Sequence, residues 1–270
     1  MTNPEKIKVR ADSEKGADST KRYLRHSPIS VDDRFLDLGA NMCSVANWVA
    51  AKGCASVLAY EPFPLTLAQA VPVAAVRLVP KAITADGRDI VMSLAKAAIE
   101  RNYTCSAHVA RSNRKDAVFV ANIKSDKIED VLREFQPTYG KIDIEGGEYE
   151  VIPAGDFSGM HTLFVEFHGC NSPTQTVLMT MCLKRLLTQG LTPTHGWARN
   201  AQFDPRQDNL GLTGVGFWRE VLFQRGTTEP TNMSLLLDGV KRILDSGKWK
   251  GPRGLCSQVA FDRLVKETFS

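Results

Sequence analysis

Residues 35–41 read FLDLGAN, an apolar run that carries one acid and ends in a Gly-Ala-Asn turn. The run predicts a buried strand over 35–38 that leads through the turn into a helix. That helix is expected to end at Lys52-Gly53, because glycine is typical just beyond a helix C-terminus. The apolar run SVLAY at 56–60 predicts a second strand. A strand, a helix and a strand at these intervals indicate a βαβ unit.

The same alternation continues along the chain. Further strands are predicted at 76–79, 140–145, 162–168 and 215–223, and further helices at 127–135 and 174–189. Asp86-Gly87 is a turn signal and 118–120 is strand-like, so 86–123 is expected to form a surface hairpin or insertion. We therefore predict one Rossmann-like α/β domain over 31–225, between a basic N-terminal extension, 1–30, and a helical C-terminal appendage, 226–270.

Composition places the chain among ordinary globular proteins, with 43% hydrophobic and 24% charged residues. No apolar run approaches the roughly 20 residues that cross a bilayer, and the polar N-terminus lacks the apolar core of a secretory signal. We therefore expect a cytoplasmic protein without membrane contact. The six cysteines form no C-x-x-C pair, so we expect reduced thiols and neither a zinc site nor a disulfide framework.

The net charge of +4 is unevenly distributed. Residues 1–30 carry seven Lys/Arg against four Asp/Glu, and residues 226–270 carry seven against five. The middle of the chain is therefore close to neutral. Basic ends can help to contact an anionic partner such as a nucleic acid, although solvated basic termini are also common.

Two acids frame the first candidate binding site. Asp37, Gly39 and Asn41 follow the first strand, and Glu61 closes the second. Glycine lets a ligand approach the backbone closely, and the following helix N-terminus is expected to offer free N–H groups. A carboxylate about 20 residues on, at the tip of the next strand, can accept both hydroxyls of a ribose. The pattern predicts a nucleotide-like cofactor, and the absence of a full G-x-G-x-x-G disfavours NAD.

The second candidate site is the run KIDIEGGE at 141–148. Lys141, Asp143 and Glu145 alternate, so a continuous strand would place them on one face. A central parallel strand should be nearly all apolar, and charge there is costly unless it is paired or functional. We therefore expect Asp143 and Glu145 to act beside the reactive end of the cofactor. Glu148 is equally well explained as a complement to the dipole of the following helix.

In their order and spacing, six blocks of the chain resemble the FkbM family of S-adenosylmethionine-dependent methyltransferases. The blocks are FLDLGANMCS, VLAYEPFP, KAITADG, DKIEDVL, KIDIEGGEYEVI and LFVEFHG, over about residues 33–170. The resemblance implies the class I methyltransferase fold, a mostly parallel seven-stranded sheet with an antiparallel last strand. It also implies methyl transfer from S-adenosyl-L-methionine, typically to a hydroxyl oxygen, here of a small molecule or sugar.

The resemblance also implies roles for single residues. Those that would line the methionine and sugar end of the cofactor are Asp37, Gly39 and Asn41. Glu61 would hold the ribose hydroxyls, and Phe63 would lie against the adenine. Cys43 departs from the family pattern, which has glycine there, and its larger side chain is expected to weaken cofactor binding.

A base must remove the proton of the acceptor, and the candidates are Asp143, Glu145 and His168. His168 ends the fifth predicted strand, and its ordinary pKa suits proton transfer near neutrality. Asp143, Glu145 and Glu166 could supply oxygen ligands to a metal, but we favour a metal-free site. Two alternatives stay open. One is an RNA ribose methyltransferase whose basic ends grip phosphates, and the other is a non-catalytic interaction module, which Cys43 favours.

Overall fold

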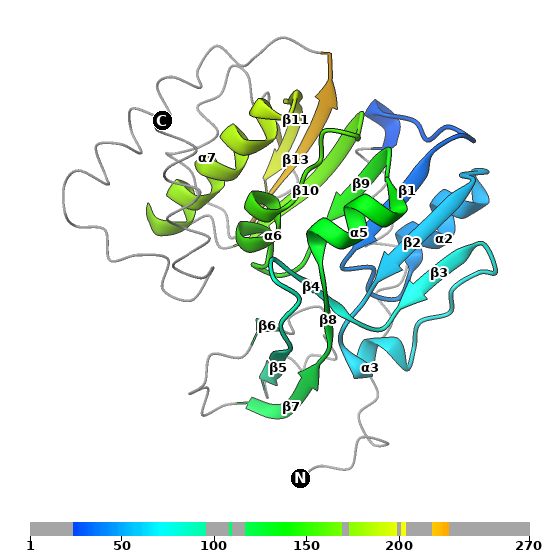
Figure 1. The fold of residues 1–270 in the computed structure, drawn as a ribbon, viewed down its shortest axis with the longest axis vertical. Helices are drawn as coiled ribbons and strands as arrows, with labels where there is room; N and C mark the ends of the chain where they lie inside the picture. Colours follow the sequence, from blue (N-terminus) through cyan, green and yellow to red (C-terminus); the bar gives the residue numbers. More distant parts are fainter. Residues whose placement is uncertain are drawn as a thin grey trace. The chain divides into compact units, whose positions relative to one another are not determined.

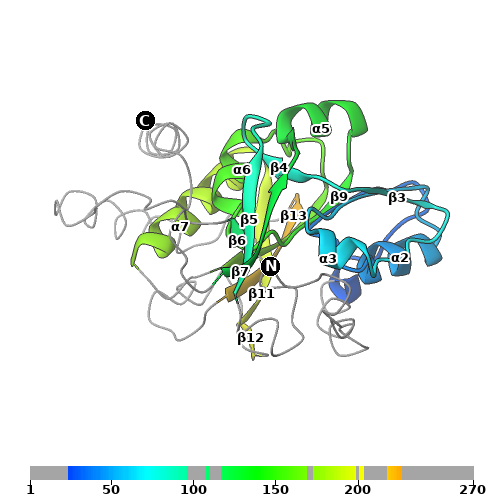
Figure 2. The same ribbon diagram turned by 90° about the horizontal axis from the view of Figure 1, so that it is seen from below.

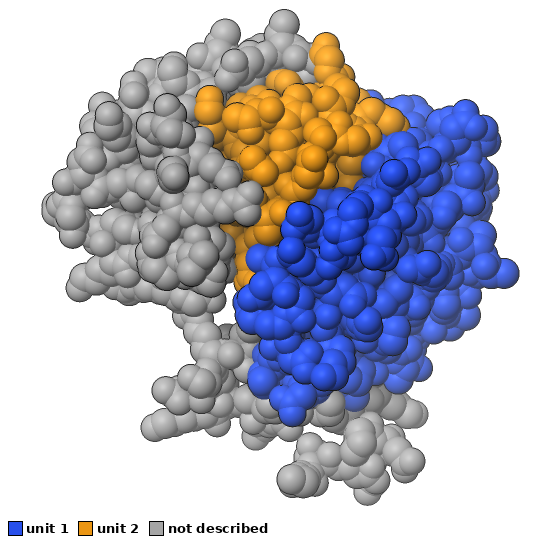
Figure 3. Space-filling model, in the orientation of Figure 1, with its two compact units in different colours: residues 1–141 blue, residues 142–270 orange. Residues whose placement is uncertain are grey.

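The structure is a computed structural model that describes residues 24–95, 108–109, 117–168, 173–198, 201–203 and 218–226. The chain divides into two compact units, residues 1–141 and 142–270, which Figure 3 colours separately. The division falls within strand β9 (Tyr139–Ile142). Nearly all of the expected terminal extensions lies outside the described residues, so the domain boundaries at 30 and 225 stay predictions.

The first unit contains the expected βαβ arrangement (Figure 1). Its parallel strands are β1 (Arg34–Leu38), β2 (Ser56–Tyr60) and β3 (Val76–Val79). They follow β9 in the order β9-β1-β2-β3. The last four residues of both β1 and β2 are buried, as expected for strands covered on two faces.

Two helices connect these strands. Helix α2 (Ser44–Ala51) packs against β1, β2 and β3 through Val45, Ala46 and Val49. Helix α3 (Pro64–Leu67) is a single turn that begins with proline, whose fixed φ suits the first helical position. The predicted helix between Leu38 and Ser56 is therefore confirmed.

The segment after β3 forms two small sheets in the same unit. Strands β4 (Ala82–Thr84) and β8 (Ser125–Lys127) pair in parallel. Strands β5 (Ile90–Ala95), β6 (His108–Val109) and β7 (Ala117–Ile123) form an antiparallel sheet in the order β6-β5-β7 (Figure 2). Helix α5 (Ile128–Phe135) follows β8. The structure thus confirms that 86–123 interrupts the main alternation with antiparallel strands.

The second unit carries the strands expected near the end of the fold. They are β10 (Thr162–His168), β11 (Leu191–Ala198), β12 (Ala201–Phe203) and β13 (Trp218–Arg225), in the order β12-β11-β13-β10. Strand β13 is antiparallel to both β10 and β11, which therefore share one direction. Helix α6 (Glu148–Ala154) contacts helix α7 (Pro173–Thr188), and α7 contacts β11. Among the described residues, no helix combines the length and the apolar character needed to cross a bilayer.

The class I fold is expected to have seven strands. The first unit contains four of them, β9, β1, β2 and β3, and the second unit contains the other three, β10, β13 and β11. Strand β12 is a three-residue addition at the edge. The mostly parallel α/β fold with an antiparallel last strand is therefore confirmed.

One boundary was predicted wrongly. Strand β9 ends at Ile142 and does not continue to residue 145. The reason lies in the backbone, because Glu145 has a φ of +53° and Gly146 a φ of +102°, values that belong to a left-handed turn. Asp143 and Glu145 consequently lie in the connection to α6 and do not extend the strand face of Lys141.

Candidate functional site

The loop after β1 is tied to the end of β2 by its backbone. The N–H groups of Gly39 and Ala40 both donate to the Tyr60 carbonyl, at 3.0 and 2.9 Å. Gly39 has a φ of +84°, a conformation that glycine adopts without steric cost. The glycine of the first motif is therefore required by the course of the loop itself.

Glu61 joins the same loop from the tip of β2. One carboxylate oxygen, Oε2, accepts the Asn41 N–H at 2.9 Å, and the other, Oε1, accepts the Phe63 N–H at 2.9 Å. The side chain is only 7% exposed. Burial raises the pKa of Glu61 to about 7, although the two backbone N–H groups favour the charged form.

The backbone of the loop is hydrogen-bonded within the protein. Its N–H groups at Gly39, Ala40, Asn41 and Cys43 all donate to protein acceptors, the last to the Ala40 carbonyl at 2.8 Å. The free N–H groups expected for a ligand belong to the N-terminus of the following helix, which begins at Ser44, and that expectation stays a prediction. The hydrogen bonds hold the loop in one conformation, which is a form of preorganisation for binding.

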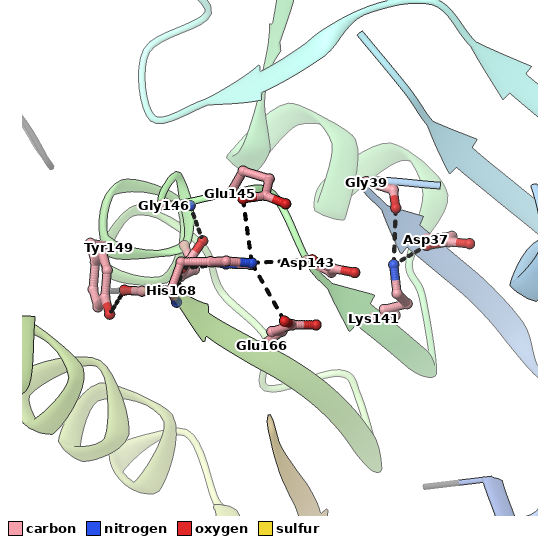
Figure 4. A network of polar contacts seen from close by, with 10 residues as sticks. Asp37, Gly39, Lys141, Asp143, Glu145, Gly146, Tyr149, Glu166 and His168 are labelled. Atoms are coloured by element: carbon pink, nitrogen blue, oxygen red, sulfur yellow. Dashed lines mark hydrogen bonds and ion pairs between the residues drawn. The ribbon is translucent and has the colours of Figure 1, made fainter. Parts of the chain in front are cut away.

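Lys141 stabilises this loop from β9. Its ammonium lies 3.3 Å from Asp37 Oδ1 and donates to the Gly39 carbonyl at 2.9 Å (Figure 4). Asp37 is fully buried and Lys141 is 5% exposed, so both charges are desolvated and depend on each other. Sequence reasoning grouped Lys141 with Asp143, whereas the structure pairs it with Asp37.

Cys43 is the residue that precedes α2, and it is completely buried. Its φ of +65° lies in the left-handed region, which favours glycine and explains why a glycine suits this position. Burial, followed by the charges of Asp37 and Glu61, raises the pKa of the thiol to about 12. Cys43 is therefore a neutral packing residue and not a reactive thiolate.

Phe63 packs in a hydrophobic cluster that joins α3 to the small sheets. The other buried members of this cluster are Leu65, Ala82, Ile90, Met92 and Ile123. Phe63 is buried in this cluster, so the structure gives it a packing role. Its contact with an adenine ring stays a prediction.

The second unit holds His168 in a fixed orientation at the end of β10. Glu148, the first residue of α6, accepts the His168 backbone N–H at 2.7 Å through Oε1, and the same oxygen lies 3.1 Å from the ring Nδ1. Its other oxygen accepts the Gly146 N–H at 2.9 Å. The Tyr149 hydroxyl donates to the His168 carbonyl at 2.7 Å. Glu148 is fully buried, so it positions the imidazole from inside the protein.

The other ring nitrogen of His168 faces three carboxylates. Nε2 lies 3.8 Å from Asp143 Oδ1, 3.6 Å from Glu145 Oε2 and 3.5 Å from Glu166 Oε1 (Figure 4). Glu166 and His168 are two residues apart on β10 and therefore share a face. The structure thus brings together Asp143, Glu145 and His168, the three residues predicted to be catalytic. Their catalytic roles stay predictions.

These carboxylates change the acid–base character of the histidine. Burial lowers the pKa of His168, but the charges of Glu148, Glu145 and Asp143 outweigh it and raise the pKa well above its usual value. The ordinary pKa expected for His168 from the sequence is therefore wrong. A histidine that already holds a proton cannot accept the proton of the acceptor.

Sequence reasoning undervalued two residues of this group, Glu148 and Glu166. Glu166 could have been found from the period of two, because it precedes His168 by two positions in a predicted strand. The helix-dipole interpretation of Glu148 remains compatible with its place in the first turn of α6. Its hydrogen bond to His168 spans 20 residues and leaves no local signal.

Comparison with known proteins identifies the family of the chain. The model of the methyltransferase FkbM domain matches residues 37–189, more than half of the chain. Comparison with curated proteins finds no match.

Two solved structures are similar at a low level. The methyltransferase FkbM from Methylobacillus flagellatus KT is 16% identical, with a TM-score of 0.35, and the match covers 61% of this chain and 40% of that chain. The precorrin-6y C5,15-methyltransferase from Geobacter metallireducens GS-15 is 13% identical, with a TM-score of 0.42, and the match covers 83% of this chain and 95% of that chain. These TM-scores are too low to support an argument about fold or function.

Proposed function

Because the chain belongs to the methyltransferase FkbM domain family, we propose that it transfers a methyl group from S-adenosyl-L-methionine to a hydroxyl oxygen of a small molecule or sugar. The observation that carries the proposal is Glu61, a buried carboxylate at the tip of β2 that is bound to the loop after β1. Open α/β sheets bind ligands beyond the carboxyl ends of their strands.

The residues around Glu61 fit a nucleoside-like cofactor. Each of its carboxylate oxygens accepts one backbone N–H and retains a lone pair that can accept a ribose hydroxyl. Gly39 has no side chain to obstruct a ligand, and Lys141 holds its carbonyl in place. Asp37 and Asn41 complete the loop that we assign to the methionine and sugar end. The sulfonium of the cofactor supplies an already activated methyl group.

The acceptor must be oriented and must lose a proton. Well-oriented intramolecular reactions gain roughly 7–11 kcal/mol from positioning in the best cases, and a positioned base adds about 10²–10⁴-fold. We assign the base to the carboxylates around His168, with Asp143 as the first choice and Glu145 as the second. A positively charged His168 would help to hold the acceptor oxygen as negative charge develops on it.

Calorimetry with S-adenosylhomocysteine tests the cofactor assignment. Above pH 7, where Glu61 is ionised, Glu61→Ala removes a charged acceptor and should weaken binding by about 2–4 kcal/mol, roughly 30- to 1000-fold. Glu134→Ala is a matched control, because Glu134 is an exposed acid on α5. Unchanged binding in a folded Glu61→Ala protein, judged by circular dichroism, would refute the assignment.

The acceptor class needs a separate experiment. The full chain is incubated with methyl-labelled S-adenosylmethionine and a panel of hydroxylated small molecules, sugars and RNA. Label in a small molecule or sugar, released under conditions that cleave methyl ethers, supports the proposal. Label found only in RNA would mean that the acceptor is RNA and not a small molecule or sugar. The absence of any transfer despite cofactor binding would favour an interaction module.

A further inference from the structure

We propose that Asp143, Glu166 and His168 form a binding site for one divalent cation within residues 142–270. One ligand atom from each of these residues lies within 4.8 Å of the other two. Two of the ligands come from one face of β10 and the third from the connection between β9 and α6. Binding of the ion does not require the cofactor, but the site shares Asp143 and His168 with the group assigned to methyl transfer above. A bound ion requires the neutral imidazole, so the ion would take the place of the charged His168 beside the acceptor oxygen.

The distances fit an ion better than direct hydrogen bonds. A charge-assisted N–H···O bond is about 2.7–2.9 Å long, whereas His168 Nε2 lies 3.5 Å from Glu166 Oε1 and 3.8 Å from Asp143 Oδ1. Two ligands that each lie about 2.1 Å from a metal are about 3.0 Å apart at the 90° angles of an octahedral site and about 3.6 Å apart at 120°. The observed spacing therefore admits a cation after small side-chain adjustments.

The orientation of His168 is that of a metal-binding histidine. Such histidines usually present one ring nitrogen to the metal and donate the other N–H to a carboxylate, which fixes the ring. Here Glu148 Oε1 lies 3.1 Å from Nδ1 and also accepts the backbone N–H of the same residue. Nε2 is therefore directed at the carboxylates of Asp143, Glu145 and Glu166 (Figure 4). Glu148 is thus a positioning residue for the proposed site.

Charge also favours a cation. Asp143, Glu145, Glu148 and Glu166 place four carboxylates around one imidazole, and the charge of a divalent ion would offset half of theirs. Glu145 Oε2, at 3.6 Å from Nε2, is near enough to become a fourth ligand. Carboxylates together with one imidazole suit Mn²⁺, and Mg²⁺ is the natural competitor. This inference departs from the metal-free site favoured by the sequence.

The full chain is titrated with Mn²⁺ alone. Electron paramagnetic resonance of the free ion and calorimetry each measure how much Mn²⁺ is bound. We expect one ion per chain, with binding weakened at least tenfold by Glu166→Gln and by His168→Gln. Asp143→Asn is nearly isosteric and provides a third variant if either of these fails to fold. Glu134→Gln, an exposed acid outside the site, should bind Mn²⁺ like the unmodified chain.

Two results would overturn the proposal. One is the absence of saturable binding up to about 1 mM Mn²⁺, the weak end of protein sites for divalent cations. The other is equal affinity in the unmodified chain and in the folded site variants. S-adenosylhomocysteine is absent from this titration, so a chain that binds no Mn²⁺ can still bind the cofactor through Glu61. A chain whose cofactor affinity does not depend on Glu61 can likewise still bind Mn²⁺. The two proposals can therefore fail separately.

Discussion

The two polar regions of this protein differ in how their charges are compensated. In the first unit, the Asp37 carboxylate lies beside the Lys141 ammonium and Glu61 accepts two backbone N–H groups. In the second unit, several carboxylates converge on the single imidazole of His168. The first arrangement has a matched partner for each acid, and the second has an excess of negative charge.

This difference is consistent with the proposed division between cofactor binding and methyl transfer. Matched and buried charges fix a backbone, so the loop around Gly39 is held ready for an uncharged part of a ligand such as a ribose. Excess negative charge attracts a proton, a cation or a hydroxyl group that is losing its proton. We therefore expect recognition of the cofactor in the first region and reactivity in the second, and each of the following variants tests one side of this expectation.

The largest effect is expected for Lys141→Met. The variant leaves Asp37, which is fully buried, without the ammonium that lies 3.3 Å from its Oδ1. Removing one partner of a buried ion pair costs about 3–5 kcal/mol, because the remaining charge stays desolvated and unpaired. Urea denaturation should show this loss in the free energy of unfolding.

An exposed ion pair of the same unit provides the matched control. Lys124 lies 2.6 Å from Asp89, and both side chains are more than half exposed. Lys124→Met should therefore change the free energy of unfolding by less than about 1 kcal/mol. If both lysine variants lose the same small amount, the loop is not held by Lys141 and the comparison fails.

Sequence reasoning predicted the loop well because its signals are local. The strand, the turn at Gly39 and the acid at Glu61 follow one another within a single βαβ unit, and the structure confirms each element. The partner of Lys141 could not be found this way. Asp37 lies 104 residues away from it, and local periodicity carries no information about such pairs.

The residues of the second region were predicted from the sequence, but the backbone turn that positions them was not. The alternation of Lys141, Asp143 and Glu145 is typical of a strand. A positive φ is uncommon for residues other than glycine, so the sequence does not indicate the positive φ of Glu145. The turn there removes Asp143 from the strand face. The same turn leads into α6, where Glu148 binds His168.

Glu61 is expected to make stability depend on pH. Its pKa rises from 4.5 to about 7 on folding, so the folded state holds this proton more tightly than the unfolded chain does. The contribution is complete below pH 4.5 and is lost as the pH rises through 7. Relative to Glu61→Gln, the free energy of unfolding should fall by about 3 kcal/mol over this interval.

Urea denaturation of both proteins at several pH values between about 4.5 and 8 measures this difference. The glutamine variant has no proton to lose at this position and serves as the reference. A difference between the two proteins that stays constant over the whole interval would show that Glu61 is not desolvated as the structure indicates.

Asp143→Asn tests the reactive side of the comparison. The variant keeps the shape of the side chain and removes the proposed base, so methyl transfer should slow by roughly 10²-fold or more. Affinity for S-adenosylhomocysteine should change little, because the cofactor is assigned to the first region. Lys141 already lies beside Asp37, so the free energy of unfolding should also change little.

Rates of transfer to the identified acceptor, measured beside calorimetry and denaturation midpoints, separate these effects. A loss of stability of several kcal/mol would instead assign Asp143 a structural role. A stable and fully active Asp143→Asn protein would move the base to Glu145, the second choice.

The smallest effect is expected for Cys43→Gly. Glycine relieves the left-handed backbone, where Cys43 has a φ of +65°, but it loses the contacts of the buried sulfur and gains freedom in the unfolded chain. Each of these terms is about 1 kcal/mol, so the free energy of unfolding should change by no more than about 1 kcal/mol. Cofactor affinity should be equal or better.

Cys43→Ala isolates the backbone term, because alanine also loses the sulfur but keeps the unfavourable φ. The alanine variant should be less stable than the glycine variant by about 1 kcal/mol, although alanine is the more stabilising residue in most positions. Denaturation midpoints of the two variants measure this order directly. Equal stability, or a more stable alanine variant, would mean that the loop is not constrained at residue 43. A large loss of cofactor affinity in the folded glycine variant would show that the sulfur itself contributes to the binding site.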